Sequence, residues 1–122
     1  MRFETSTPRL YVEIAIVRAA QLARGVYELQ QHKPMLLAEG FAPANFDALE
    51  NWCASALFDD KERALLAYVD EMADHGNVAD QTFETLGRFF TPMQIMELSF
   101  AVGSYYGTAL IMNALQIKLE PK

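Results

Sequence analysis

Apolar residues recur along this chain with the spacing of helices. Residues 12–23 are apolar except at Glu13, Arg18 and Gln21, a pattern typical of a helix that is covered on most sides. No segment alternates strictly between apolar and polar residues over the length of a strand. We therefore expect an all-α fold, a bundle of about five to six helices that forms a single domain over residues 1–122.

Capping residues predict where several helices begin. Asp59 with Glu62, and Thr91 with Gln94, each match the capping box that opens a helix. Asp80 is expected to cap a shorter helix between these two. The helix after Thr91 is expected to be the longest, because the apolar sequence continues almost to the end of the chain.

Glycine and proline divide the rest of the chain. Residues 26–39 are expected to form a second helix after a tight joint at Gly25, interrupted at Pro34, which lacks the backbone N–H of a helical residue. Residues 45–52 are expected to form a short helix, and Gly76 is expected to end the helix that begins near residue 60.

Composition and charge exclude several classes of function. The net charge of −6 argues against nucleic acid and against anionic membrane surfaces, because both are bound mainly by Lys and Arg. A chain of 122 residues that is 52% hydrophobic has little interior, so we expect part of its apolar surface to meet another copy in a homo-oligomer. The first residues lack the apolar core of a signal peptide, which makes the cytoplasm the expected location.

The nearly continuous apolar run at residues 95–115 has the length of a membrane span. It contains Glu97 and Asn113 and has no basic flank, so we expect a buried helix and no membrane. Gly103 and Gly107 reduce the bulk in its middle, which lets another helix approach closely.

Two polar features are candidates for chemistry. Glu13 lies on a helical stripe whose other members are apolar, where a carboxylate would hold or pass a proton near neutrality. The alternative is a surface ion pair with Arg9, one turn earlier. Glu28 and His32 share a face of the next helix, where the carboxylate can orient the imidazole for general base catalysis, although such pairs are also common on solvated surfaces. Folding back at Gly25 would bring Glu13 and His32 within about one and a half turns, or ~8 Å.

Other kinds of site have less support in the sequence. Glu13, Glu28 and His32 form at best a weak three-ligand set without a paired-histidine motif, so we expect no metal. Cys53 has no second thiol and is expected to be inert. No phosphate-binding loop or nucleophile elbow occurs, and no cofactor is expected.

The order of these features resembles the carboxymuconolactone decarboxylase family, part of the alkylhydroperoxidase D-like superfamily. The resemblance spans residues 9 to 119 and is carried by six segments: 12–20, 27–32, 38–40, 57–66, 78–83 and 113–115. It implies a helical bundle that assembles as a trimer or a multiple of one. It also implies that Glu13 and His32 belong to the site of the family.

The chain departs from the redox-active members of that superfamily. Those members contain a Cys-x-x-Cys-x-x-x-His motif. When His32 is aligned with the histidine of that motif, Gly25 and Glu28 take the positions of the two cysteines. The chain therefore resembles the branch without the two cysteines. Many relatives also have an arginine where this chain has Leu110, which removes an anchor for an anionic substrate.

The leading hypothesis is acid–base catalysis of the decarboxylase or lyase type on a small organic substrate. Aromatic catabolism is one setting for such a reaction. Glu13, Glu28 and His32 would be the catalytic residues. Tyr27, Tyr105 and Asn113 would line the pocket, and their other role would be packing. Two alternatives are a peroxiredoxin-type antioxidant protein and a binding subunit without catalysis.

Overall fold

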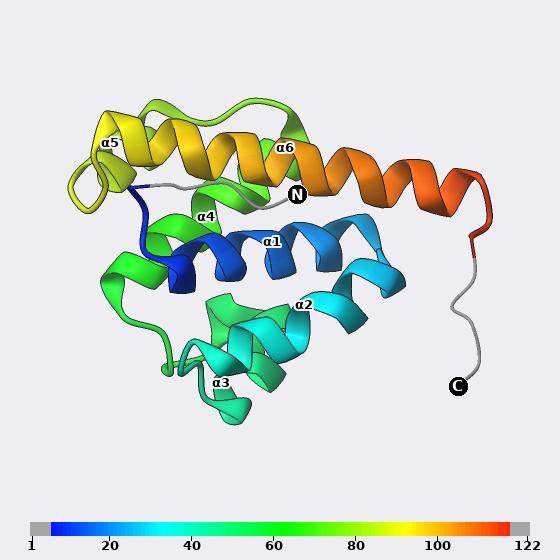
Figure 1. Cartoon of the computed structure of the whole chain (residues 1–122). Helices are drawn as coiled ribbons and strands as arrows, with labels where there is room; N and C mark the ends of the chain where they lie inside the picture. Colours follow the sequence, from blue (N-terminus) through cyan, green and yellow to red (C-terminus); the bar gives the residue numbers. More distant parts are fainter. Residues whose placement is uncertain (1–5, 118–122) are drawn as a thin grey trace.

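The computed structural model describes residues 6–117, and it confirms the all-α fold: the described residues contain helices and no strand. Within residues 6–117, six α-helices and one 3-10 helix follow one another (Figure 1). Their bounds are α1 Arg9–Ala23, α2 Val26–Ala38, α3 Pro43–Ala48, η1 Leu49–Ala54, α4 Asp60–His75, α5 Asp80–Gly87 and α6 Pro92–Ala114.

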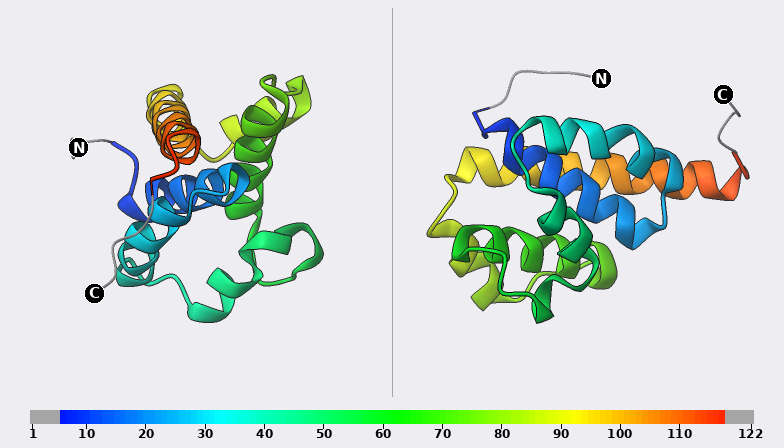
Figure 2. Two further views of the ribbon diagram at one scale, coloured as in Figure 1. Left: turned by 90° about the vertical axis from the view of Figure 1, so that its right-hand side faces the viewer. Right: turned by 90° about the horizontal axis from the view of Figure 1, so that it is seen from below.

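Helix α1 is the centre of the bundle. It packs against α6, α2 and α4, which lie on different sides of it (Figures 1 and 2). Ten of its fifteen residues are buried, and the fully buried side chains include Ile14, Ile16 and Val17. Because partners cover this helix on several sides, its sequence is apolar nearly all round instead of carrying one apolar stripe.

The two capping boxes form as the sequence predicts. Asp59 accepts a hydrogen bond from the Glu62 amide at 2.8 Å, and the Glu62 side chain accepts one from the Asp59 amide at 2.9 Å. Thr91 and Gln94 make the same reciprocal pair at the start of α6. These contacts satisfy backbone N–H groups that have no partner inside the helix.

The start of α5 differs from the prediction. Asp80 is the first residue of α5 and not its cap, and the preceding Ala79 makes no side-chain capping bond. The carboxylate of Glu71 on α4 serves this end instead: it accepts the Ala79 amide at 2.9 Å and the Thr82 hydroxyl at 2.6 Å. The cap is therefore tertiary, and no local sequence signal encodes it.

Two further boundaries differ from the predictions. The single short helix expected at residues 45–52 is two elements, because Asn51 has non-helical backbone angles and the chain tightens into η1 after α3. Helix α2 continues through Pro34 without a break in its helical assignment.

The joint between α1 and α2 depends on close packing against α6. Arg24 ends α1 in the left-handed conformation, with φ of 56°. A Cβ atom added at Gly25 would lie 2.8 Å from the Cβ atom of Ala109 on α6. The Asn113 amide, also from α6, donates to the carbonyl oxygen of Ala23 at 2.8 Å. The α1–α2 turn and the second half of α6 therefore hold one another in place.

Helix α6 has one buried and one exposed apolar face. Ile95, Leu98 and Val102 are buried in the core, whereas Met96 and Ile111 are 62% and 60% exposed. Among the described residues, α6 alone has the length and apolar composition of a membrane span. It packs on α1 along one face, but only 28% of its apolar segment is buried, so α6 is less buried than the sequence predicts.

The close contact at Gly25 predicts that this glycine cannot be replaced without loss of stability. We expect Gly25→Ala to lower the free energy of unfolding by about 1–3 kcal/mol, because the added methyl group forces α6 or the turn to move. Gly87→Ala is the matched control, since a Cβ there meets nothing within 4 Å. Urea denaturation followed by circular dichroism measures both, and equal stabilities of the two variants would contradict the prediction.

Candidate active site

The candidate site lies where the first turns of α1 face the middle of α2. Glu13 comes from α1, and Glu28 and His32 come from α2, one helical turn apart. Tyr105 reaches the same place from the middle of α6. The fold-back at Gly25 thus brings together the three residues that the sequence singles out for catalysis.

Glu13 is a fully buried carboxylate with a partner on each oxygen. Its side chain has no exposed surface. Oε1 lies 2.6 Å from a guanidinium nitrogen of Arg9, and Oε2 lies 2.8 Å from Nδ1 of His32. The sequence leaves two alternatives for Glu13, a buried carboxylate or a surface ion pair with Arg9. In the structure Glu13 is buried and also paired with Arg9. The contact with His32 is direct, although the spacing along the helices predicts only a loose match.

His32 lies between two carboxylates. Its Nε2 atom is 3.8 Å from Oε2 of Glu28, which is beyond a direct hydrogen bond but close enough for strong electrostatic attraction. Both side chains are buried, with about the same small exposure of 6%. The edge of the imidazole meets the ring of Tyr105 at a centroid distance of 5.0 Å. This contact and the bond to Glu13 fix the plane of the imidazole.

Burial changes the proton affinity of two groups in the site. Loss of solvent raises the pKa of Glu28, and the charge of His32 offsets part of this increase. Burial also raises the pKa of Tyr105, and the carboxylates of Glu13 and Glu28 raise it further. Glu28 therefore keeps a proton to higher pH than an ordinary glutamate, and the Tyr105 phenol remains a hydrogen-bond donor.

Glu28, His32 and Tyr105 line a pocket of about 470 Å³, a size that suits a small organic molecule. The pocket combines apolar walls with charged and polar groups. Its lining residues are Arg9, Glu28, Gln31, His32, Met35, Ala38, Glu39 and Tyr105. Sequence reasoning did not assign Gln31, Met35 or Glu39 to the site. The one sequence feature that could have identified them is their helical spacing from Glu28 and His32, which places them near the same face of α2.

Tyr27 and Asn113 do not join this pocket. They line a neighbouring cavity of about 250 Å³ between the start of α2 and the end of α6. The Tyr27 hydroxyl accepts a hydrogen bond from Gln31 at 2.8 Å, and Asn113 caps α1. Glu28 lines both cavities and separates Tyr27 from His32.

Other candidate chemistry lies outside the site. Within residues 6–117, no group of three or more His, Cys, Asp or Glu side chains is arranged to hold a metal ion. Cys53 is exposed on η1, where it lines a different, small cavity beside Trp52. Leu110 is exposed on α6 and does not line the His32 pocket.

The chain is similar to one known family and to a solved structure. The model of the carboxymuconolactone decarboxylase family matches residues 2–71. No curated protein matches the chain. The chain is similar to a crystal structure of a protein of unknown function from Agrobacterium tumefaciens, provisionally named as the antioxidant defence protein AhpD. The identity is 21% and the TM-score 0.86, over 96% of this chain and 82% of that chain, a likeness that shows the shared fold.

The matched segment covers more than half of the chain and includes the Glu13–His32 pair with Glu28. The similar solved structure extends the likeness of fold through α5 and α6. The chain belongs to the carboxymuconolactone decarboxylase family.

Proposed function

We propose that this protein is an enzyme that uses acid–base chemistry of the decarboxylase or lyase type on a small organic substrate. The observation that carries the proposal is the buried contact of 2.8 Å between Glu13 and Nδ1 of His32, beside a pocket of about 470 Å³. A binding subunit without catalysis would have little need for two buried carboxylates around one imidazole, since each costs desolvation energy.

Glu13 orients the imidazole and selects its tautomer. A guanidinium only donates hydrogen bonds, so Oε1 of Glu13 accepts from Arg9. Oε2 then accepts the proton on Nδ1, which leaves Nε2 as the atom that exchanges protons with a bound molecule. A buried carboxylate that holds a catalytic histidine in this way recurs in many acid–base sites.

Glu28 and Tyr105 complete the proton transfer. In a decarboxylation the C–C bond to the leaving carboxylate breaks, and its electron pair stays on the substrate as an enolate-like charge. The Tyr105 phenol donates a hydrogen bond to that charge. Glu28, whose pKa is raised by burial, passes its proton to Nε2 of His32 across the gap of 3.8 Å, and Nε2 delivers that proton to the carbon to form the new C–H bond. Carbon dioxide leaves, and Glu28 regains one proton from solvent for each turnover.

Arg9 supplies the positive charge that an anionic substrate requires. It lines the pocket with a side chain that is 37% exposed while it also holds Glu13. A guanidinium has five N–H donors, so one contact with Glu13 leaves others for a substrate carboxylate. Many relatives have an arginine where this chain has Leu110, which cannot bind an anion. In this chain Arg9 would bind the substrate carboxylate instead.

Thiol peroxidase chemistry has little support in this chain. Gly25 and Glu28 occupy the positions of the two thiols in redox-active relatives. The contact of a Cβ atom at residue 25 with Ala109 leaves no room for a cysteine there without a shift of the backbone. Cys53 is alone and outside the site, so it has no thiol to resolve a sulfenic acid.

We also infer that the exposed face of α6 is covered by other copies of this chain, in a trimer or a multiple of one. Met96, Leu110 and Ile111 are each close to half exposed or more, and Gly103 and Gly107 lie between them with little side-chain bulk. A second apolar helix can approach such a face closely. Because Tyr105 is on the same helix, assembly also stabilises one wall of the active-site pocket.

The first prediction concerns the Glu13–His32 pair. We expect Glu13→Gln and His32→Ala each to lower kcat/KM by roughly 10²–10⁴-fold, because proton transfer fails without either partner. The double variant should lose little more, since the two residues act as one unit. Release of carbon dioxide from a panel of small lactone and keto acids measures the activity. The rate should fall as the pH rises through the pKa of Glu28, which burial raises above that of an ordinary glutamate, because Glu28 must carry a proton to act as the acid.

His75→Ala is the control for that experiment. His75 is the second of the two histidines and lies exposed at the end of α4, so its loss should leave the rate unchanged. Additive losses in the double variant, or full activity of His32→Ala, would place the chemistry elsewhere in the molecule.

A second prediction concerns peroxides. We expect no appreciable turnover of organic hydroperoxides with a dithiol reductant, because the described site contains no thiol. A coupled assay of reductant consumption tests this. Turnover by the wild-type protein that disappears in Cys53→Ser would show that the lone cysteine is active after all.

A third prediction concerns assembly. Light scattering at micromolar concentration should give the mass of a trimer or its multiple, and Ile111→Glu should shift it towards the monomer. Leu57→Glu places the same charge on an apolar residue of similar exposure, 51% against 60%, and should leave the assembly intact. A monomeric wild-type protein would contradict the inference.

A further inference from the structure

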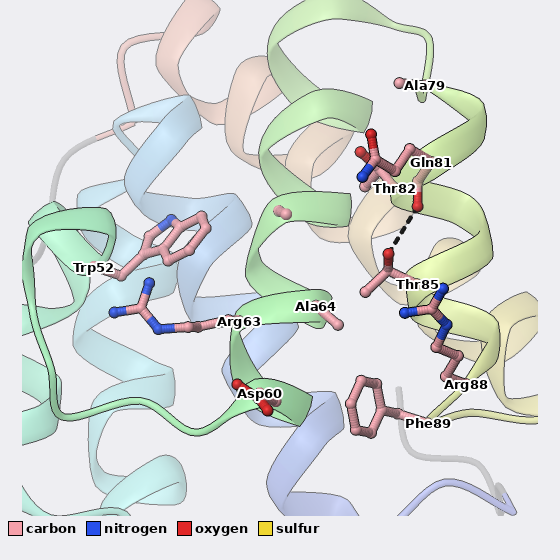
Figure 3. A pocket seen from close by; sticks show the side chains of 11 residues that line it. Trp52, Asp60, Arg63, Ala64, Ala79, Gln81, Thr82, Thr85, Arg88 and Phe89 are labelled. Atoms are coloured by element: carbon pink, nitrogen blue, oxygen red, sulfur yellow. Dashed lines mark hydrogen bonds between the residues drawn. The ribbon is translucent and has the colours of Figure 1, made fainter.

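A second pocket lies on the opposite side of the core from the active-site helix α2. It has a volume of about 510 Å³ and lies between η1, α4 and α5 (Figure 3). It shares no lining residue with the His32 pocket. Its lining residues are Trp52, Asp60, Arg63, Ala64, Ala67, Ala79, Gln81, Thr82, Thr85, Arg88 and Phe89.

Two arginines in this pocket lack a carboxylate partner among the described residues. Arg63 donates to the backbone carbonyl oxygens of Ser55 and Phe58, and its guanidinium lies 5.8 Å from the ring centroid of Trp52. Arg88 is exposed at the end of α5, and its side chain has no polar partner within the described part of the chain. By contrast, Arg9 and Arg18 are each paired with a carboxylate.

Arg88 gives the Phe89 end of the pocket a positive charge, on a protein whose whole chain carries −6. The lining also contains the carboxylate of Asp60, and Glu71, which bonds the lining residue Thr82, adds a second negative charge. These carboxylates disfavour a ligand with several negative charges and favour one with a single charge near Arg88.

The shape of the pocket results from small side chains on α4 and before α5. Ala64, Ala67 and Ala79 leave space that larger residues would fill, and they make the floor apolar. Trp52 and Phe89 add aromatic surface on opposite sides of Ala64 (Figure 3). Apolar walls with a few convergent polar groups are typical of sites for small organic molecules.

We propose that this pocket binds a small monocarboxylate with an apolar body. The guanidinium of Arg88 holds the carboxylate, and the apolar body rests on the alanines between Trp52 and Phe89. The Thr85 side chain lies beside Arg88 and offers a further polar contact, whereas Arg63 lies at the Trp52 side of the pocket (Figure 3). This binding is independent of the acid–base site, because the two pockets are built from different residues.

The chain contains a convenient reporter of this binding. Trp52 is the only tryptophan and lines the pocket, so its fluorescence responds to a ligand there. The probes are phenylacetate and hexanoate, with phenylacetamide and hexanamide as neutral analogues of the same shape. We expect the acids to change the fluorescence in a saturable way, and the amides to bind at least roughly tenfold more weakly, because a charged hydrogen bond is lost.

Two variants test the placement of the ligand. Arg88→Gln should weaken binding of the acids by roughly tenfold and leave the weak binding of the amides unchanged. Ala67→Leu should weaken both acids and amides, because the added side chain occupies the apolar floor. Circular dichroism verifies that each variant is folded.

Two control variants separate this proposal from the active site. Arg24→Gln removes the same charge from an exposed arginine that lines neither pocket, and it should bind like the wild type. His32→Ala should also bind normally, whatever its catalytic rate. Equal binding of acids and amides, or unchanged binding by Arg88→Gln, would overturn the proposal, as would loss of binding in His32→Ala.

Discussion

Burial of the Glu13 carboxylate is the constraint on which the site depends. Removing an isolated carboxylate from water costs several kcal/mol, so this residue needs a partner on each oxygen. Arg9 is one turn away on the same helix, but His32 reaches Glu13 only if α2 folds back along α1. That fold-back in turn requires a residue without a side chain at Gly25. Stability and chemistry are therefore coupled at this point.

A second set of contacts joins the other half of the molecule to α1. Arg18 binds Asp70 of α4 through two nitrogens, at 2.6 and 3.1 Å, and Trp52 of η1 donates to the same carboxylate at 3.0 Å. Arg18 also donates to the carbonyl oxygen of Leu49. The elements η1 and α4 beside the second pocket are thus joined to α1 by a partly buried ion pair that shares no residue with the Glu13 site.

Helix α6 connects the site with the surface of the molecule. Its buried face contributes Tyr105 beside the imidazole and Ala109 against the α1–α2 turn. Its exposed face is apolar along most of its length. In the proposed assembly, contacts on the apolar surface of α6 would reach the pocket through the core residues on its other side.

The sequence by itself determined the fold class and those features that arise within one turn of helix. The capping boxes at Asp59 and Thr91 form because each joins groups only three residues apart. The sequence also identifies the residues of the site: Glu13 lies on an otherwise apolar helical stripe, and Glu28 and His32 share one helix face. The structure brings these three side chains together.

Only the tertiary structure decided which atoms meet across the helices. The direct contact of Glu13 with Nδ1, the cap that Asn113 provides for α1, and the cap that Glu71 provides for α5 all join residues from different helices. Tyr27 lines only the cavity at the start of α2, whereas Glu28 lines both that cavity and the His32 pocket. Helical periodicity tells which residues share a face, but the packing of α1 against α2 and α6 sets the distances between faces.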